Sequence, residues 1–303
     1  GTEDGGRPRS RAQNTQFYFN PSVSWSDITS GSPAFRSYPH GFLHDVTGMS
    51  IFGGGFQREH LISFLNSSVA TKLLQAVAPT LHAQIGDISL LPVEEYETPS
   101  AVLDILTAVA SADWNDFETS WDFVAPFWMS APAVELGEAA MVPLSSTRPG
   151  SVHLRSRVED WSAAWAQIAR DQQTRETENN RIVALAYGLE NEVSADVPLH
   201  RISLTRNVEF RYGPGKSDEE YAALERADVA AEFASYAVGC MFGRYSVDEP
   251  GLILADQGGT LQDYLARVPT PNFMPDADNV IPIVDGDWFE DDIAARFRQF
   301  LRV

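Results

Sequence analysis

Cysteine is almost absent from this chain of 303 residues, which contains a single one, Cys240. A lone cysteine excludes an intrachain disulfide framework. Because Cys240 lies in the apolar stretch EFASYAVGCMFGRY, we expect its thiol to be reduced and buried. The sequence also has no apolar run long enough to span a membrane, and its first residues lack the apolar core of a signal peptide. We therefore predict a cytoplasmic protein without membrane contact.

Positive charge is also scarce. The chain has 22 Lys and Arg against 42 Asp and Glu, a formal net charge of -20. This balance argues against non-specific nucleic-acid binding by the chain as a whole, because Lys and Arg supply the affinity for phosphates. The deficit is uneven: residues 1–98 carry 6 basic and 9 acidic side chains, whereas residues 99–303 carry 16 and 33. Four of the six histidines also lie in the first part, so any contact with an anion is expected there.

Hydrophobic patterning predicts an α+β fold that begins with a mixed α/β region. Short alternating segments (QFYF, SVSWSDI, GFLHDV and GMSIF) predict strands separated by Ser, Gly and Pro turns. Apolar residues at helical spacing predict one continuous helix over residues 57–77, and IGDISLLPV predicts a turn followed by a strand. We expect residues 1–11 to form a flexible tail and residues 12–98 to form one domain.

The remainder of the chain has a helical texture. Residues 99–150 combine an apolar helix, SAVLDILTAVASADW, with a Pro- and Ala-rich linker. Residues 151–303 are predicted to form a largely α-helical C-terminal region, whose first long helix ends at Gly188. The run RDQQTRETENNR within that helix is interpreted as a solvated face. A later helix is expected to begin at Ser217, with Glu220 completing a capping box.

Two groups of polar residues raise the alternative of metal binding. His40, His44 and Asp45 are closely spaced, but an intervening glycine prevents a helix and no further partner is evident. The acidic stretch DADNVIPIVDGDW has no glycine at the sixth position of a calcium loop and has apolar residues where ligands belong. We interpret Asp285 or Asp287 as a helix cap instead, and we expect no metal site.

Three consecutive glycines, residues 53–55, stand between a strand pattern and a helix pattern. A glycine-rich turn at the start of a helix can bind the phosphates of a cofactor. A dinucleotide site would also need a βαβ unit and an acidic residue about 20 positions further on, whereas Asp87 comes roughly 30 positions later. We therefore interpret the glycines as a turn. No arrangement of Ser, His and Asp or of paired carboxylates supports a self-contained hydrolase.

Several long stretches resemble one known family. Five of these stretches are ETSWDF, NNRIVALAYGLENEV, RNVEFRYGPGKS, SYAVGCMFGRYSVDEPGLILADQG and DNVIPIVDGDWFEDDI. Their order resembles that in the C-terminal half of adenine-specific DNA methyltransferases of the PglX type, from BREX phage-defence systems. FLNSSVATKLLQAVAPTLHAQIGDISLLPV resembles the closing part of a target recognition domain. The resemblance covers nearly the whole chain except 1–12 and 125–150. It implies a target recognition domain over residues 12–98 that binds double-stranded DNA.

The resemblance also implies what this chain does not contain. The family binds S-adenosylmethionine in a Rossmann-like domain and holds the adenine with an Asn-Pro-Pro-aromatic motif. The nearest string here, NPSV at residues 20–23, lacks the second proline and the aromatic ring. We therefore expect a fragment of a longer enzyme, inactive alone and without catalytic residues or a cofactor site of its own. The sequence begins without Met and stops inside an amphipathic pattern, which gives the same expectation of a fragment.

Polar and basic residues of the 12–98 region are the candidate DNA contacts. Arginine suits guanine or phosphate, small hydroxyl groups suit either kind of base edge, and glutamine suits adenine. For the loop 30–41 the alternative is an ordinary exposed loop. For the helix the alternative is a solvated face, and for LHAQIGD it is a turn held by Asp87. The candidates are Arg36, Ser37, Tyr38, His40, Arg58, His60, Lys72, His82 and Gln84.

A rival hypothesis is an acidic protein-interaction module. The net charge of -17 over residues 99–303 would repel DNA. That region would instead dock the methyltransferase domain of the parent enzyme, or other BREX proteins. A locally positive face on residues 12–98 would favour DNA recognition over this alternative.

Overall fold

Helices and one small antiparallel sheet make up the computed structural model, which describes residues 12–28, 33–45, 47–78, 82–126, 133–135, 141–143, 154–286 and 288–303. This confirms the α+β class. The chain forms two compact units. The first unit combines Gly1–Thr107 with Gln172–Val197, and the second combines Ala108–Asp171 with Pro198–Val303. The first unit therefore takes in residues 172–197 besides the predicted domain 12–98.

A three-stranded sheet organises the first unit. A 3-10 turn, η1 (Thr15–Phe17), precedes the strands β1 (Ser22–Ser26), β2 (Arg36–Tyr38) and β3 (Gly48–Ile51). The central strand is β1, which pairs antiparallel with both neighbours in the order β2-β1-β3. Strand β1 and strand β3 were predicted by the alternation in SVSWSDI and GMSIF, and both predictions are confirmed.

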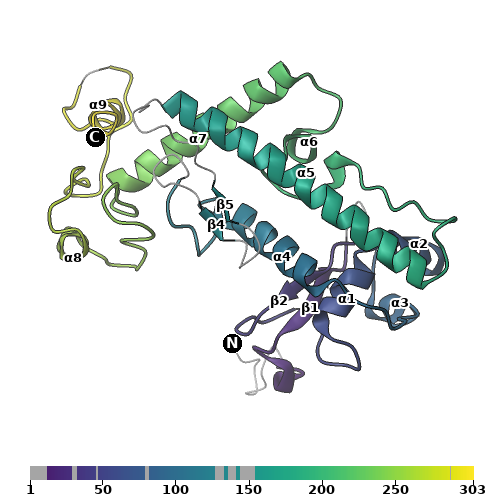
Figure 1. The fold of residues 1–303 in the computed structure, drawn as a ribbon. Helices are drawn as coiled ribbons and strands as arrows, with labels where there is room; N and C mark the ends of the chain where they lie inside the picture. Colours follow the sequence, from purple (N-terminus) through teal and green to yellow (C-terminus); the bar gives the residue numbers. More distant parts are fainter. Residues whose placement is uncertain are drawn as a thin grey trace. The chain divides into compact units, whose positions relative to one another are not determined.

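One face of this sheet packs on helices to form the core of the first unit. Val23 and Trp25 are buried on that face, since alternate residues of a strand point to the same side. The helices α1 (Arg58–Leu65) and α2 (Ser68–Val77) and the short α3 (Ile85–Ile88) follow the sheet (Figure 1). Phe64 on α1 and Val69 on α2 are fully buried in this core, which also includes Val183 from a later helix.

The continuous helix predicted over residues 57–77 is wrong, because the chain breaks at Asn66 and Ser67. The side chain of Asn66 donates to the carbonyl oxygens of Ile62 (3.1 Å) and Phe35 (3.0 Å), and Asn66 ends α1. Ser67 then accepts a hydrogen bond from the backbone N–H of Ala70 and begins α2. Two residues with capping side chains therefore outweigh an apolar stripe that continues in phase across them.

Other local predictions in this unit also fail. QFYF contributes to η1 instead of a strand, and the described residues of GFLHDV form no strand. The segment IGDISLLPV begins with α3 and has no strand after it. Asp87 stabilises this turn, because its carboxylate accepts the backbone N–H of Gln84 at 3.0 Å. The glycines that follow β3 do turn the chain, with Gly53 and Gly54 at positive φ.

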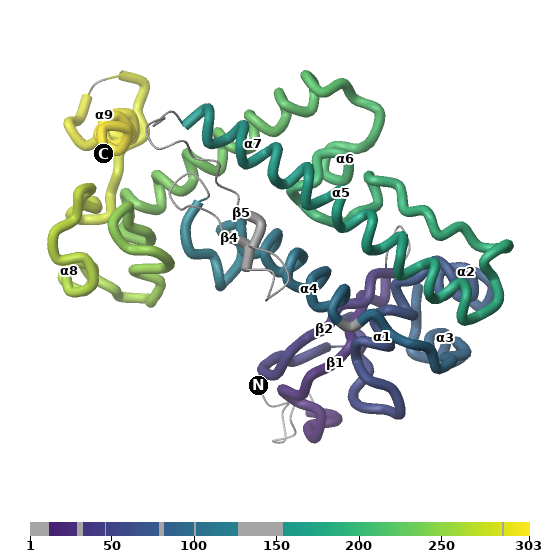
Figure 2. Tube along the Cα trace, in the orientation of Figure 1, coloured from purple at the N-terminus to yellow at the C-terminus, as the bar shows by residue number. Residues whose placement is uncertain are grey.

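The second unit is mainly helical. Its elements include α6 (Val208–Tyr212), α7 (Asp218–Met241), α8 (Leu261–Arg267) and α9 (Ile293–Phe300), together with the 3-10 turn η3 (Leu199–Arg201). The strands β4 (Ala133–Glu135) and β5 (Met141–Pro143) pair antiparallel within the stretch predicted to be a linker. Figure 2 shows that the chain between α7 and α9 is largely irregular except at α8. The helices α4 (Ser100–Asn115) and α5 (Leu154–Ala186) contribute residues to both units.

The predicted helix ends are mostly confirmed. At the end of α5, Gly188 has a φ of +65°, and the N–H of Leu189 donates to Ala184 O at 2.8 Å. Ser217 begins α7 with the predicted capping box. At α9 the prediction is wrong, because the N-cap is Asp292, which accepts the N–H of Ala295 at 2.7 Å. Asp285 caps no helix, and Asp287 lies outside the described residues.

The charged run RDQQTRETENNR on α5 is not a simple solvated face. Asn179 and Asn180 within it are buried in the first unit. Asn179 accepts the hydroxyl of Ser63 at 2.6 Å and donates to Ser63 O at 3.0 Å. Asn180 accepts the N–H of Ser68 at 3.0 Å. These amides therefore satisfy polar groups of α1 and α2, which explains why polar residues occupy a buried helix face.

The core of the second unit confirms the predicted state of Cys240. Its thiol is free and buried beside Tyr236, and burial raises its pKa to about 12. Such a thiol stays protonated at neutral pH and is a poor nucleophile. Trp161 and Trp165 are also buried. Across the described ranges, no helix combines the length and the apolar character needed to cross a membrane.

Close packing in α7 predicts that Gly239→Ala destabilises the protein. A Cβ atom at Gly239 would lie 2.5 Å from Cδ2 of Tyr245, whose side chain is buried. Overpacking of this kind costs about 1–3 kcal/mol. Replacing Gly by Ala in a helix gains only about 1 kcal/mol of helix propensity, so the net change is destabilising over most of that range. We expect a lower free energy of unfolding, measured by urea denaturation followed by tryptophan fluorescence.

Gly86→Ala is the matched control for that substitution. Gly86 also lies in a helix, α3, but a Cβ atom there has no neighbour within 4 Å. It is therefore expected to be neutral or to stabilise by at most about 1 kcal/mol. Equal stability changes in the two variants would show that Tyr245 yields without cost.

Candidate functional site

The face of the sheet that points away from the core is polar. Residues opposite one another on paired strands share a face. The register places Ser24 opposite both Arg36 and Ser50, and Ser22 opposite Tyr38. Ser22 and Ser24 are buried, with their hydroxyl oxygens 3.0 Å apart, and Ser24 Oγ lies 2.7 Å from Ser50 Oγ. We call this side the outer face.

His44 covers the serines of the outer face. Its Nε2 lies 3.1 Å from Ser22 Oγ and its Nδ1 lies 3.4 Å from Ser24 Oγ. Burial lowers the pKa of His44, so the ring is neutral at pH 7. Its partners are hydroxyl groups, and no group of three or more His, Cys, Asp or Glu with metal-binding geometry occurs among the described residues. The sequence did not predict this contact, because the ring and the serines are about 20 residues apart.

Three of the candidate DNA contacts meet at the edge strand β2. Arg36 and Tyr38 lie on the outer face, and the guanidinium of Arg58 donates to Tyr38 O at 3.2 Å. Ser37 lies on the opposite side, because it pairs with Val23 of the core face. The predicted loop 30–41 is thus partly a strand, and its residues 36–38 alternate between two faces.

The remaining candidates lie elsewhere in the first unit. His40 is exposed beyond β2, and Lys72 is exposed on α2. His82 is half-exposed, with its Nδ1 3.3 Å from Asp27 Oδ2. Gln84 is exposed at the N-cap of α3. These four side chains remain predicted contacts.

His60 is a core residue and not part of a solvated helix face. Its Nδ1 lies 2.7 Å from Thr98 Oγ1 and its Nε2 lies 2.9 Å from Glu94 O. The ring also stacks on Phe56, with ring centroids 5.1 Å apart. Both nitrogens are therefore engaged inside the unit, where His60 ties α1 to the segment before α4.

Arg36 interacts electrostatically with Glu176 of α5. Its positive charge acts to lower the pKa of Glu176 on α5, although burial raises that pKa by more. A cation within range of a carboxylate retains its attraction for phosphate but with reduced strength. Arg36 and Arg58 are thus two cations at one edge, and one of them is partly compensated.

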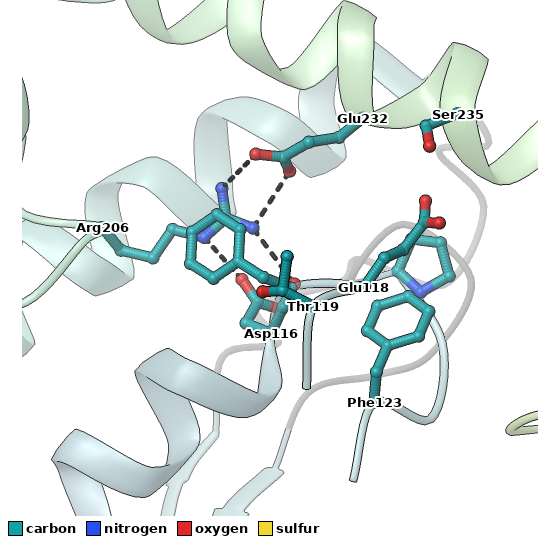
Figure 3. A pocket seen from close by; sticks show the side chains of 9 residues that line it. Asp116, Glu118, Thr119, Phe123, Arg206, Glu232 and Ser235 are labelled. Atoms are coloured by element: carbon teal, nitrogen blue, oxygen red, sulfur yellow. Dashed lines mark hydrogen bonds and ion pairs between the residues drawn. The ribbon is translucent and has the colours of Figure 1, made fainter. Parts of the chain in front are cut away.

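A separate pocket of about 190 Å³ lies in the second unit (Figure 3). Arg206 lines it, with a side chain that is only 4% exposed. The Nε of Arg206 donates to Asp116 Oδ2 at 2.7 Å, and its two terminal nitrogens each donate to one oxygen of Glu232 at 3.0 Å. The guanidinium carbon also lies 3.8 Å from the ring centroid of Phe117 and 4.4 Å from that of Trp161.

Carboxylates outnumber cations around this pocket. Asp116, Glu118 and Glu232 line it together with Arg206, which is the one cation among its described lining residues. Burial raises the pKa of Asp116 to about 7, although the charge of Arg206 acts to lower it. Burial likewise raises the pKa of Glu118. Burial is the largest cause of both shifts, and it is opposed by the charge of Arg206 at Asp116 and by the charge of Arg244 at Glu118. The arrangement suits a structural ion-pair cluster, and its surplus negative charge would favour a cation over an anion.

Sequence reasoning missed this cluster. Arg206 lies 90 residues from Asp116 and 26 residues from Glu232. No local pattern connects residues so far apart. The only signal was indirect, because Glu118 begins the quoted stretch ETSWDF and Arg206 begins RNVEFRYGPGKS.

Similarity to known proteins spans nearly the whole chain. The chain is 30% identical over 314 aligned residues to the adenine-specific methyltransferase PglX of Lacticaseibacillus casei (strain Zhang), and the alignment covers 98% of this chain and 22% of that protein. It is 26% identical over 298 residues to the adenine-specific methyltransferase BrxX of Escherichia coli O9:H4 (strain HS), which covers 97% of this chain and 23% of that protein. No family model matches the chain. The chain thus spans about a fifth of the length of these curated relatives.

Proposed function

We propose that this chain, which is similar over 97–98% of its length to a segment of adenine-specific methyltransferases of the PglX and BrxX type, is the DNA-recognition and C-terminal portion of such an enzyme in a BREX phage-defence system. Its first unit reads the DNA sequence. Methyl transfer from S-adenosylmethionine to adenine N6 takes place in a catalytic domain that this chain lacks. The parent enzyme marks self DNA against phage DNA.

The observation that carries the DNA-binding part is the absence of acidic residues from the segments that build the outer face, where Glu176 of α5 is nevertheless within electrostatic range of Arg36. Residues 12–26, 33–44 and 47–58 contain no Asp or Glu in a chain with 42 of them. The same segments supply Arg36 and Arg58. A neutral to positive surface in a chain of net charge -20 is the part best suited to approach phosphates.

A salt titration of DNA binding tests the proposal. The chain is mixed with a duplex that carries the methylated motif of its source organism, and with a scrambled duplex. We expect tighter binding to the motif, and weaker binding to both duplexes as salt rises. The double variant Arg36→Ala, Arg58→Ala is expected to reduce the slope of log affinity against log salt by up to about 2, since each lost phosphate contact removes about 0.9.

The variant Arg181→Ala is the matched control, because it removes an exposed arginine of the first unit on α5, where it pairs with Glu178 at 3.3 Å. Its salt slope should equal that of the parent chain. Equal slopes for the double variant and the parent chain would remove the two arginines from the interface. The absence of binding even at low salt would count against autonomous DNA recognition.

An acidic docking module is the alternative function. The observation that favours it is the surplus of carboxylates around Arg206, within a region of net charge -17. In that case the second unit docks the methyltransferase domain or other BREX proteins through their basic surfaces. The salt titration discriminates, since this alternative predicts no DNA binding by the chain alone.

A further inference from the structure

A layer of aromatic rings covers the outer face of the sheet. Phe17 stacks on Phe52 with centroids 5.0 Å apart, and His44 contacts both Phe52 (5.8 Å) and Tyr38 (5.3 Å) edge to face. Tyr38 in turn contacts Phe42 at 5.1 Å. The core cluster of the first unit is built from other residues. We call Phe17, Phe19, Tyr38, Phe42, His44 and Phe52 the outer aromatic layer.

The outermost rings of this layer are exposed although they are apolar. The exposed fractions are 39% for Phe17, 54% for Phe19 and 45% for Phe42. Contiguous exposed apolar surface of this kind marks an interaction site more often than an isolated exposed ring does.

Backbone hydrogen bonds hold the main chain of Phe19 beside that of Phe42. The N–H of Phe19 donates to Phe42 O at 3.1 Å, and the N–H of Gly41 donates to Phe19 O at 3.0 Å. Phe19 has a φ of +63°, which is unfavourable for an aromatic residue. Residues held in such conformations cluster at ligand-binding sites, because the surrounding structure must maintain them.

The charge around the layer indicates the kind of partner. Three acid-free segments supply all its rings, and the only acidic residues between them are Asp27 and Asp45. The carboxylate of Asp45 accepts hydrogen bonds from the N–H groups of Thr47 (2.9 Å) and Gly48 (3.0 Å), and Asp27 lies beside His82. Tyr38 belongs both to the layer and to the strand that carries Arg36. Apolar rings bordered by two arginines suit a polyanion with flat hydrophobic groups, which is nucleic acid.

We propose that Phe19 and Phe42 insert into a base step of duplex DNA and stack on a base that has lost its neighbour. This inference rests on the proposed function, because enzymes that modify a base swing it out of the stack and leave a gap. Apolar side chains are known to insert between base steps in proteins that bend DNA. Arg36 and Arg58 then hold the adjacent phosphates, and the two rings recognise the gap and not the sequence.

A fluorescent duplex with one abasic position, called the gapped duplex here because one base is missing from the stack, tests the inference. The probe is a duplex with 2-aminopurine beside an abasic position, and the comparison is the same duplex fully paired. We expect the chain to bind the gapped duplex about tenfold more tightly, since stacking on an aromatic ring supplies about 1–3 kcal/mol per base. Stacking should also quench the 2-aminopurine. The double variant Phe19→Ala, Phe42→Ala should lose both the preference and the quenching, with the affinity and salt slope for the paired duplex unchanged.

Phe289→Ala is the matched control, because Phe289 is also 54% exposed but belongs to the second unit. It should keep the preference for the gap. Binding to paired DNA without any preference for the gap, or a preference that survives in the double variant, would overturn the inference and leave the proposed function standing. No binding to either duplex would reject both. Loss of self-association in the double variant, seen by sedimentation with DNA binding unchanged, would assign the rings to a contact between copies and overturn the inference.

Discussion

Replacing Arg206 by alanine is expected to lower the free energy of unfolding by about 3–5 kcal/mol, the usual cost of removing one partner from a buried ion pair. The guanidinium is almost fully buried and donates hydrogen bonds to Asp116 and to both oxygens of Glu232. Without it, the carboxylates of Asp116 and Glu232, which are only 15% and 25% exposed, remain close together without their cation. Urea denaturation followed by tryptophan fluorescence measures the change, because Trp161 packs on the same guanidinium.

Two further substitutions separate burial from charge alone. Arg181→Ala also removes one arginine, but its pair with Glu178 is exposed, so the expected cost is below about 0.5 kcal/mol. Arg206→Lys keeps the charge but loses the two-pronged geometry toward Glu232, and should fall between these values. A cost of less than about 1 kcal/mol for Arg206→Ala would mean that the cluster is solvated in solution.

The sequence predicted the parts of the fold that follow from local chemistry. Strand β1 follows from the alternation of Ser22 to Ser26, and α7 follows from the cap at Ser217. The edge strand β2 was missed because three residues are too few to show a period. The break between α1 and α2 was missed because the apolar stripe continues in phase, although Asn66 and Ser67 carry the capping side chains that end and begin the helices.

The candidate site was less predictable, because it depends on contacts between distant residues. Arg36 and Arg58 were identified individually, but only the antiparallel register places Arg36 on the outer face and Ser37 on the core face. His60 has the same polar character in sequence as His40, yet Phe56 and Tyr96 enclose it. Phe17 and Phe19 read as part of a strand, whereas a 3-10 turn and a residue at positive φ present them to solvent.

The unusual ionisation of Asp116 predicts that stability falls as pH rises from about 4 to about 7. Burial raises the pKa of this carboxyl in the folded chain to about 7, whereas its ordinary value is 3.8. Between these values the folded chain holds a proton that the unfolded chain releases, so unfolding becomes more favourable as pH increases. The slope from this one group is at most about 1.4 kcal/mol per pH unit.

Asp116→Asn isolates this contribution from the rest of the acidic chain. Asparagine keeps an oxygen that accepts from Arg206 Nε but cannot ionise. Between pH 4 and pH 8 the variant should therefore gain stability relative to the parent chain, by up to about 4 kcal/mol. Urea denaturation at several pH values measures the difference, and a constant difference would show that Asp116 is ionised throughout.

Asp263→Asn provides a contrast of opposite sign. Asp263 is exposed, and hydrogen bonds from the Thr260 hydroxyl and backbone N–H lower its pKa. A lowered pKa contributes stability that is present above the ordinary value and lost as pH falls through the folded value. Asp263→Asn should therefore lose stability relative to the parent chain as pH rises toward about 4, with no further trend above that pH, whereas Asp116→Asn gains stability between pH 4 and pH 8. Each variant removes one negative charge, so opposite trends of stability with pH cannot come from net charge alone. Such trends would assign the pH dependence to the local surroundings of each carboxyl.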